Sequence, residues 1–283
     1  MAKYQEYSNG IEPTWCKGCG DFSVLRSLQI ALSDLEIPNK NLSVVSGIGC
    51  SGRISGYMKS YSFHGIHGRV LPVAQGIKAA NPKLTVIATG GDGDGFAIGS
   101  GHFIHAAKRD MDITYIVMDN QIYGLTKGHT SPISEKGFKT SSTPYGKEDT
   151  ALEPALLALS GGASFVAQGF SGYQEELVDI IKEGIQHKGF SFIHIYSPCI
   201  TFNKINTYQW YRQHLIPLKD QNKKHDKSSL KEAMELVVDK EGMLTGLIYQ
   251  NQRKSETDAP SLVDQTRALS KEEFDDLFQR LYI

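Results

Sequence analysis

Short apolar runs rich in β-branched and aromatic residues alternate with segments of helical spacing along most of this chain. This alternation constrains the fold most, because strands joined through helices pair in parallel. The strand-like runs lie at residues 42–46, 84–89, 113–118, 164–167 and 190–197. The helix-like segments lie at residues 22–35, 71–80, 97–108 and 174–187. We therefore predict an α/β fold over about residues 20–200, with a doubly wound, mainly parallel sheet covered by helices.

The pattern changes in the last quarter of the chain. Residues 217–229 are rich in Lys, Asp and Asn without any period, which is typical of a linker. Beyond them we expect a short helix at 230–237, a strand at 244–249 and a helix from Lys271 to the end. We divide the chain accordingly into a domain at residues 1–216, which carries the site, and a C-terminal extension at residues 217–283.

The charge balance argues against nucleic acid as a partner. The 30 lysines and arginines are matched by 31 aspartates and glutamates, so the formal net charge is -1 and no basic block stands out. Residues 1–10 lack the apolar region of a secretory signal, and no run of about 18 apolar residues could span a bilayer. We expect a cytoplasmic protein, with neither nucleic acid nor a membrane among its partners.

A glycine-rich segment, Gly90-Gly91-Asp92-Gly93-Asp94-Gly95, directly follows a strand-like run. Glycines bring bare backbone amides close to a ligand, so the segment predicts phosphate binding. It is not a dinucleotide fingerprint, because Phe96 or Ile98 occupies the position of the third glycine. A Walker A loop is also excluded, since no Gly-Lys-Ser/Thr follows.

A carboxylate inside this glycine run indicates a metal carried with the phosphates. Asp92 follows one strand-like run and Asn120 follows the next, so both side chains should reach the same crevice. Such oxygen ligands suit Mg²⁺ bound to a diphosphate. Residues 123–128 could wrap the diphosphate with backbone amides and the Lys127 cation. The alternative is an ordinary Gly/Asp turn, a strand-ending asparagine and a solvated surface lysine.

The four cysteines are candidates for metal ligation, because a cytoplasmic chain seldom pairs them as disulfides. Cys16 and Cys19 form a C-x-x-C motif before a helix, whereas Cys50 and Cys199 are single and each follows a strand. All four could converge on one side of the sheet. C-x-x-C alone is ambiguous among zinc, a redox dithiol and an iron-sulfur cluster. Four thiolates suit a soft cluster, with structural zinc or four buried core cysteines as the alternatives.

Together these motifs resemble those of the β subunits of two-subunit 2-oxoacid:ferredoxin oxidoreductases, and more narrowly those of the 2-oxoglutarate type. The resemblance covers about residues 10–215. It rests on the segments at residues 15–21, 46–54, 64–69, 91–95, 118–127 and 198–203. The fold that it implies is the diphosphate-binding type of thiamine diphosphate domain, so residues 1–216 would bind thiamine diphosphate and a 4Fe-4S cluster.

The resemblance also implies which residues hold the cofactors. The implied ligands of a 4Fe-4S cluster are Cys16, Cys19, Cys50 and Cys199. The pair of Asp92 and Asn120 resembles the G-D-G…N motif of thiamine enzymes, which implies that both side chains and the Ile122 carbonyl hold Mg²⁺. The implied thiamine diphosphate pocket consists of Gly49, Cys50, His67, Gly91, Asp92, Gly93, Asp94, Asn120, Ile122, Tyr123, Gly124, Leu125 and Lys127.

Three residues are expected to take part in the reaction itself. They are Arg53, His67 and Lys127. Arg53 falls where the family places a basic residue near the substrate, so we expect its guanidinium to pair with a carboxylate. A surface arginine is the alternative. His64 is left unassigned, because a structural histidine explains it equally well.

The implied reaction is the oxidative decarboxylation of a 2-oxoacid, most narrowly 2-oxoglutarate, to an acyl-CoA and CO₂ with reduction of ferredoxin. Thiamine enzymes need a glutamate from a separate pyrimidine-binding domain, and this chain has room for the diphosphate half only. We therefore expect an α subunit that carries this glutamate and the coenzyme A site, and a separate ferredoxin. The alternatives are pyruvate as the main substrate, a non-redox thiamine decarboxylase or synthase subunit, and a zinc-stabilised scaffold.

Overall fold

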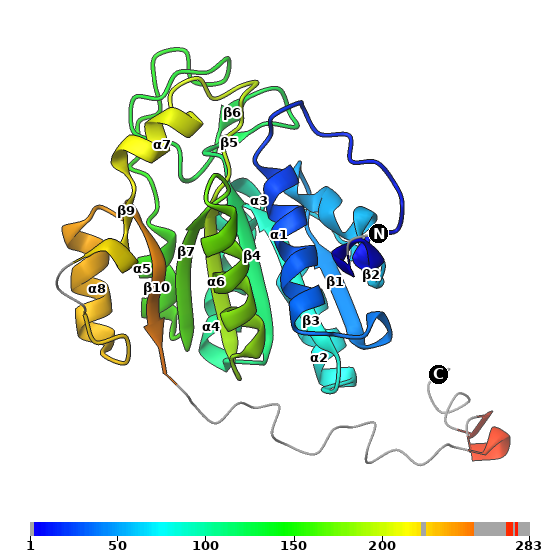
Figure 1. The fold of residues 1–283 in the computed structure, drawn as a ribbon. Coiled ribbons are helices and arrows are strands. Elements are labelled where there is room, and N and C mark those ends of the chain that lie inside the picture. Colours follow the sequence, from blue (N-terminus) through cyan, green and yellow to red (C-terminus); the bar gives the residue numbers. More distant parts are fainter. Residues whose placement is uncertain (1–2, 222–224, 252–269, 274, 277–283) are drawn as a thin grey trace.

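A single eight-stranded sheet forms the centre of the protein (Figure 1). The computed structural model describes residues 3–221, 225–251, 270–273 and 275–276. The strands follow the order β2-β1-β3-β4-β8-β7-β10-β9, and all neighbours pair in parallel except β10, which runs antiparallel to β7. Their bounds are β1 Leu42–Ser46, β2 Tyr61–His64, β3 Thr85–Gly91, β4 Ile113–Asp119, β7 Phe165–Phe170, β8 Phe190–Tyr196, β9 Ile216–Pro217 and β10 Leu244–Gln250. The predicted α/β class with a mainly parallel sheet is confirmed.

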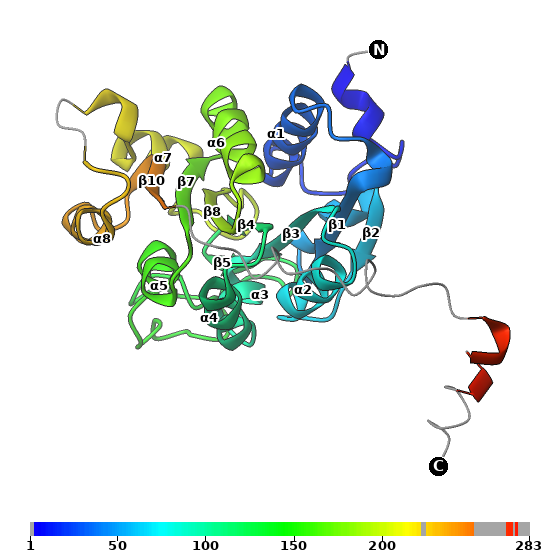
Figure 2. The same cartoon turned by 90° about the horizontal axis from the view of Figure 1, so that it is seen from below.

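Helices cover both faces of the sheet, as Figure 2 shows in the view from below. Two of them, α1 (Asp21–Asp34) and α6 (Gln174–Gln186), lie on one face. The opposite face carries α2 (Val70–Ala80), α4 (Ser100–Arg109) and α5 (Pro154–Gly161), and α8 (Leu230–Asp239) packs beside α5. The remaining elements are α3 Asp92–Phe96, α7 Tyr208–His214, the hairpin strands β5 Ile122–Tyr123 and β6 His129–Thr130, and 3-10 turns at Lys3–Tyr7, Asn39–Asn41, Ser51–Tyr57 and Leu218–Asp220.

The start of α1 differs from the prediction in one respect. The helix predicted to begin at Phe22 begins one residue earlier, at Asp21, and Gly20 is its N-cap residue. A Cβ on Gly20 would overlap the side chain of Ser197, so no residue with a side chain fits there. Asp21 instead accepts a hydrogen bond from Ser197 Oγ at 2.7 Å. The helix that follows the C-x-x-C motif is thereby tied to the end of β8.

The helix predicted at residues 97–108 begins three residues later, at Ser100, and a separate short helix precedes it. Helix α3 ends at Phe96 and α4 begins at Ser100, with a break at Ala97, where φ is -89° and ψ is -104°. The chain needs glycine at position 99, because a Cβ there would lie 2.5 Å from the carbonyl oxygen of Asp94. The first helical turn therefore begins inside the glycine-rich segment, which keeps that segment compact at the end of β3.

The C-terminal extension adds strands to the same sheet. Its predicted helix and strand are present as α8 and β10, and β10 pairs with β7 and β9. Part of the predicted linker forms β9 and a 3-10 turn, and the helix predicted from Lys271 lies largely outside the described residues. The division at residue 216 stays a prediction. No helix in the described part of the chain is long and apolar enough to cross a lipid bilayer.

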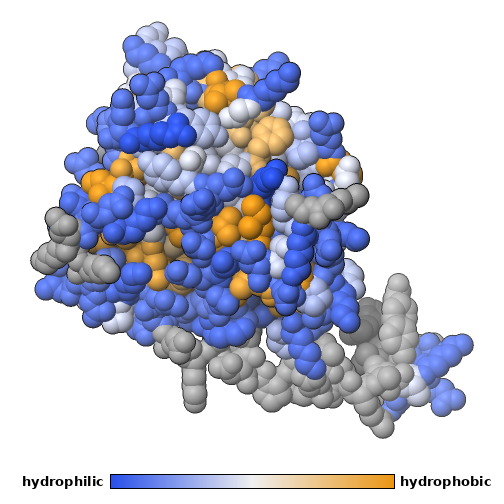
Figure 3. All heavy atoms as spheres, in the orientation of Figure 1, coloured by the Kyte–Doolittle hydropathy of each residue, from blue (hydrophilic) through white to orange (hydrophobic). Residues whose placement is uncertain are grey.

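The parallel arrangement gathers the predicted motifs at one edge of the sheet. Strands β1, β3, β4 and β8 end at this edge, which is uppermost in Figure 1, with α7 and the β5-β6 hairpin above it. The surface in the same orientation is mainly hydrophilic, and its apolar side chains form separate small patches (Figure 3). The loops that follow these strands are therefore the place where the chain can build a site.

The burial of Ile248 provides a test of how β10 contributes to folding. This side chain is fully buried in the core that α8 shares with the central strands. We expect Ile248→Ala to lower the free energy of unfolding by about 2–5 kcal/mol, since the substitution leaves a cavity. Chemical denaturation followed by circular dichroism measures this, and one cooperative transition should remain. Val238→Ala in α8, which is 60% exposed, should change stability by less than about 0.5 kcal/mol. A separate transition for the extension, with the main one unchanged, would contradict the prediction.

Candidate active site

A cavity of about 260 Å³ opens where β1, β3 and β4 end. It brings together twelve residues that the sequence predicts to bind the cofactor, which are Gly49, Cys50, His67, Gly91, Asp92, Gly93, Asp94, Asn120, Ile122, Tyr123, Gly124 and Leu125. We call it the glycine cavity. Thr126, from the segment expected to wrap the diphosphate, also lines it, as do Ile48 and Ser51, which were not predicted. Nothing in the sequence indicated that Ile48 or Ser51 belongs to a site, other than their position next to predicted residues.

A second cavity of about 240 Å³ adjoins the first and contains all four cysteines. We call it the cysteine cavity. Its wall includes Arg53, and it shares four residues with the glycine cavity, which are Cys50, Asn120, Gly124 and Leu125. Gly124 lies close to two of the thiols, because a Cβ on it would be 3.7 Å from the sulfur of Cys50 and 3.7 Å from that of Cys199. Trp15, Thr201 and Phe202 line this cavity as well and were not predicted; Trp15 precedes the first cysteine directly.

Hydrogen bonds connect the segments that carry the cysteines. The Cys19 N–H donates to the Cys16 carbonyl at 2.9 Å, which closes the C-x-x-C turn. The Trp15 Nε1–H donates to the carbonyl of Cys50 at 2.8 Å and so joins this turn to the loop after β1. Cys16 is exposed and the other three cysteines are half-buried. All four are free, which agrees with the expectation that they are not paired as disulfides.

The surroundings of the thiols fit a group that carries positive charge. Burial raises the pKa of Cys19, and it raises the pKa of Cys50 to about 12, with further contributions from nearby Asp21 and Cys199. Bound metal would favour the thiolates and displace their protons. Among the described residues no group of three or more His, Cys, Asp or Glu side chains is arranged so that it could hold a metal ion directly.

The carboxylate of Asp92 fits a bound cation. Asp92 lines the glycine cavity although only 2% of the residue is exposed, and its Oδ2 has no hydrogen-bond partner among the described residues. Burial raises the pKa of this carboxyl well above its usual range, and the charge of Asp119 adds to the shift. A buried anion without a full set of partners is costly unless a positive charge offsets it. A divalent ion in this cavity would supply that charge.

The other two predicted magnesium ligands lie on one tight turn. Asn120 Oδ1 accepts the N–H of Ile122 at 3.1 Å, and the Ile122 carbonyl accepts the N–H of Gly124 at 3.0 Å. Gln121 between them has a φ of +57°, in the left-handed region. The carbonyl of Asn120 accepts from Asn203 Nδ2 at 3.1 Å, which joins this turn to the segment that follows Cys199. The turn therefore contacts both cavities.

Asp94 holds the loops around the glycine cavity. Its Oδ1 accepts the N–H groups of Ile48 and Gly68, each at 2.9 Å, and lies 3.2 Å from Nδ1 of His67. Burial raises the pKa of Asp94, and the two N–H groups and His67 counteract this. A Cβ on Gly47 would overlap the carboxylate, so the chain approaches it without a side chain. The sequence predicted Asp94 as a pocket residue, and its contacts add a role in joining two loops.

The two predicted cationic residues, Arg53 and Lys127, differ in whether they line a cavity. Arg53 lines the cysteine cavity, and its guanidinium carbon lies 5.8 Å from the centre of the Tyr57 ring. Lys127 is exposed, has a φ of +69° and lines neither cavity, although its backbone belongs to the turn after Gly124. Its predicted contact with the cofactor stays a prediction.

The fold and the glycine cavity define a thiamine diphosphate-binding domain. Residues 47–195 match the family model "Thiamine pyrophosphate enzyme, C-terminal TPP binding domain". Residues 199–262 match the family model for the C-terminal part of the pyruvate ferredoxin oxidoreductase beta subunit. The first match spans the strands and loops that build the glycine cavity, and the second begins at the last cysteine.

Related proteins narrow the class further. The β subunit of 2-oxoacid:ferredoxin oxidoreductase 2 from Aeropyrum pernix is 42% identical over 221 residues, which is 78% of this chain and 71% of the relative. The 2-oxoglutarate synthase subunit KorB of Archaeoglobus fulgidus is 39% identical over 234 residues, covering 82% and 85%. The solved 2-oxoglutarate:ferredoxin oxidoreductase from Magnetococcus marinus, with 2-oxoglutarate, coenzyme A and succinyl-CoA bound, matches with a TM-score of 0.85 at 39% identity, covering 99% of this chain and 90% of that one. The chain belongs to the β subunits of the 2-oxoacid:ferredoxin oxidoreductases, as its motifs predicted.

The contacts of Asp94 predict a stability difference between two substitutions. Asp94→Ala removes the acceptor of two backbone N–H groups and should lower the free energy of unfolding by about 3–6 kcal/mol, since each hydrogen bond to a charged group contributes about 1.5–3 kcal/mol. Asp94→Asn keeps an acceptor oxygen and should cost less. Denaturant titration of the full chain measures both. Asp179→Ala, which removes an exposed carboxylate 3.4 Å from Lys182, is the control and should cost under about 1 kcal/mol. Equal losses for the alanine and asparagine variants at position 94 would contradict the assignment.

Proposed function

We propose that this chain is the subunit that binds thiamine diphosphate and an iron-sulfur cluster in an enzyme that oxidatively decarboxylates 2-oxoglutarate to an acyl-CoA and CO₂ and reduces ferredoxin. The observation that carries the proposal is the common wall of the two cavities. One is lined by glycines and carboxylates, the other by four thiols, and both include Cys50, Asn120, Gly124 and Leu125. Two cofactors held there would be neighbours, as a reaction that moves electrons between them requires.

In the glycine cavity the chain would bind the diphosphate end of the cofactor. The glycines at positions 91 and 93 leave backbone amides open to phosphate oxygens. Asp92, Asn120 and the carbonyl of Ile122 would hold Mg²⁺, and the unpartnered Oδ2 of Asp92 supports this role. Thiamine diphosphate, when bound, supplies the electron sink that decarboxylation of a 2-oxoacid needs. These residues would orient the cofactor and hold the Mg²⁺ that neutralises its diphosphate.

In the cysteine cavity Cys16, Cys19, Cys50 and Cys199 would hold a 4Fe-4S cluster. Such a cluster, when bound, accepts and passes on single electrons. The exposure of Cys16 supports an electron exit on that side, because a ferredoxin must approach the cluster from solvent. The hydrogen bond from Trp15 to the Cys50 carbonyl keeps the C-x-x-C turn against the wall that the two cavities share.

The chain would act together with an α subunit. Leu125, Ile200 and Phe202 line the cavities although 59%, 37% and 38% of their surfaces are exposed, and apolar side chains exposed in this way are typical of a binding surface. The family match at residues 47–195 is to the C-terminal TPP-binding domain of thiamine pyrophosphate enzymes. The α subunit would supply the pyrimidine-binding domain with its glutamate and the coenzyme A site. We place the complex in the cytoplasm.

Two observations bear on the substrate. The names of KorB relatives and of the Magnetococcus marinus enzyme favour 2-oxoglutarate, and Arg53 offers a cation for its second carboxylate. The family model matched by residues 199–262 is named after pyruvate, which keeps pyruvate as the second candidate. A site that has a cation and room for the longer substrate would favour 2-oxoglutarate over pyruvate. The distal carboxylate of 2-oxoglutarate needs a positively charged partner once it is desolvated.

The cluster assignment predicts the metal content. The full chain purified without oxygen should contain about four iron and four sulfide per molecule and absorb as a 4Fe-4S protein. Cys199→Ser should lose most of the iron, because a serine hydroxyl is a poor substitute for a soft thiolate. Thr201→Ala, in the wall of the same cavity, should keep the iron. Metal analysis and visible absorption measure both.

Two outcomes would contradict this assignment in different ways. One zinc per chain without iron or sulfide would support a zinc-stabilised scaffold. A colourless, iron-free protein that still binds thiamine diphosphate would support a decarboxylase or synthase subunit without redox chemistry.

The role of Arg53 predicts a change in substrate preference. In the complex with its α subunit, Arg53→Ala should lower kcat/KM for 2-oxoglutarate relative to pyruvate by about 10-fold or more, since a charge-assisted pair contributes about 1.5–3 kcal/mol. The assay uses coenzyme A and a viologen acceptor. Arg109→Ala, in an exposed arginine at the end of α4, should leave the ratio unchanged. An equal loss with both substrates would exclude Arg53 from carboxylate recognition.

A further inference from the structure

A strained residue lies between two of the proposed magnesium ligands. Gln121 separates Asn120 from Ile122 and adopts the left-handed conformation, with a φ of +57°. Residues other than glycine and asparagine seldom adopt this conformation. Such a conformation persists only where the surroundings fix it. The Gln121 N–H donates to Asp119 Oδ1 at 2.8 Å, and the hydroxyl of Ser134 donates to its carbonyl. The Gln121 side-chain amide also donates to Tyr211 at 3.3 Å. The direction of Asn120 and Ile122 therefore depends on Asp119 and Ser134.

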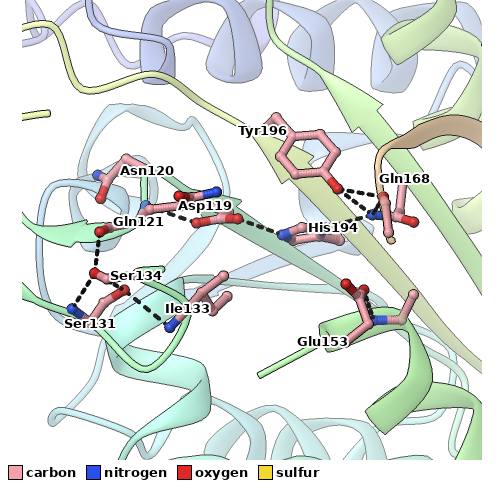
Figure 4. A network of polar contacts seen from close by, with 12 residues as sticks. Asp119, Asn120, Gln121, Ser131, Ile133, Ser134, Glu153, Gln168, His194 and Tyr196 are labelled. Atoms are coloured by element: carbon pink, nitrogen blue, oxygen red, sulfur yellow. Dashed lines mark hydrogen bonds and ion pairs between the residues drawn. The ribbon is translucent and has the colours of Figure 1, made fainter. Parts of the chain in front are cut away.

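Asp119 is itself held by a histidine on the neighbouring strand. The residue is fully buried at the end of β4, and its Oδ2 accepts a hydrogen bond from Nε2 of His194 at 2.9 Å. His194 lies in β8, which pairs in parallel with β4, and is 1% exposed. Figure 4 shows the imidazole pointing along the sheet at the carboxylate, with Gln121 on the other side of Asp119. Among the described contacts, the Nε2–H group of His194 is the hydrogen-bond donor to Asp119 Oδ2.

The far side of the imidazole faces the side-chain amide of Gln168. Nδ1 of His194 is 3.1 Å from Nε2 of Gln168, and that same Gln168 atom is 3.1 Å from the carbonyl oxygen of Gly242 and 2.8 Å from the hydroxyl of Tyr196. Because a carbonyl can only accept, this Gln168 atom is the amide nitrogen, and its two protons are shared among these three neighbours. A carboxylate oxygen also only accepts, so Nε2 of His194 carries the proton that it donates to Asp119. Tyr196 donates to the same Gly242 carbonyl at 2.6 Å, so the chain of hydrogen bonds ends in the C-terminal extension.

We infer that His194 is a positioning residue for the bound cation and diphosphate. By donating from Nε2 it orients Asp119, which keeps Gln121 in its left-handed conformation and directs Asn120 and Ile122 into the glycine cavity. The inference rests on the proposed thiamine diphosphate site and adds a residue that touches neither cofactor nor cavity. It also gives the extension a function, because the turn at Gly242 anchors the network from behind.

Replacing His194 by Gln or by Asn distinguishes the hydrogen bond that Nε2 donates from the packing of the imidazole ring. His194→Gln can place its amide nitrogen near the position of Nε2 and donate to Asp119, whereas His194→Asn reaches only the position of Nδ1. The full chain, assembled with its α subunit, is titrated with Mg²⁺ at fixed thiamine diphosphate, and cofactor binding is measured by calorimetry. We expect His194→Asn to raise the half-saturating Mg²⁺ concentration by about 10-fold, because it leaves a buried carboxylate oxygen without a donor. His194→Gln should stay within about 3-fold of the unsubstituted protein.

A matched control lies near the opposite edge of the sheet. His187 is also buried, at 4% exposure, and its Nε2 lies 2.7 Å from Ser164 Oγ, just before β8 begins. His187→Asn should lower the melting temperature about as much as His194→Asn does and leave the Mg²⁺ requirement unchanged. A purely structural role of His194 would instead make the two asparagine variants alike in both readouts.

The outcomes distinguish the inference from the function on which it rests. If the unsubstituted protein binds Mg²⁺ and thiamine diphosphate and His194→Asn binds them equally well, the inference is overturned and the function stands. If the unsubstituted protein binds neither, both are overturned. Should His194→Asn fail to fold, Ser134→Ala removes the other support of Gln121, and an unchanged Mg²⁺ requirement in that variant would also overturn the inference.

Discussion

The parallel pairing of β1, β3, β4 and β8 is the constraint on which the rest of the structure depends. Parallel strands end at the same edge, so each loop that leaves them starts within reach of the others. The segments that carry Cys50, the Gly-Asp-Gly run, Asn120 and Cys199 are far apart in sequence, yet they form two adjoining cavities. Ligands that no single loop could supply are assembled in this way without a separate domain for each cofactor.

Three buried carboxylates at this edge of the sheet differ in the groups that compensate their charge. Asp94 is compensated by backbone N–H groups from two loops, and Asp119 by the imidazole of His194 and the N–H of Gln121. Asp92 and Asp94 each keep Oδ2 without a hydrogen-bond partner among the described residues. Asp94 has His67 beside its other oxygen, whereas the charge that acts on Asp92 is that of Asp119, so Asp92 is the carboxylate that the proposed cation would compensate.

Much of the fold and most of the candidate site could be predicted from the sequence, because they depend on local patterns. Strand runs, glycine runs and cysteine spacing are visible in one dimension, and the parallel topology turns them into a common edge. The break between α3 and α4 was missed, since it comes from the close approach of Gly99 to the Asp94 carbonyl. The contact of His194 with Asp119 joins residues 75 positions apart and follows from the register of two strands. Spacing alone carries no trace of either.

Gly124 has a consequence for how a protein of this kind can change over evolution. Its backbone belongs to the wall of both cavities, and it lies close to the sulfurs of Cys50 and Cys199. A side chain at this position would lie beside both sulfurs and take volume from the cysteine cavity, and a backbone shift that relieved this crowding would move the wall of the glycine cavity. The glycine cavity and the cysteine cavity thus share one peptide unit. Mutations that adapt one cavity to a new ligand must also be compatible with the other cavity.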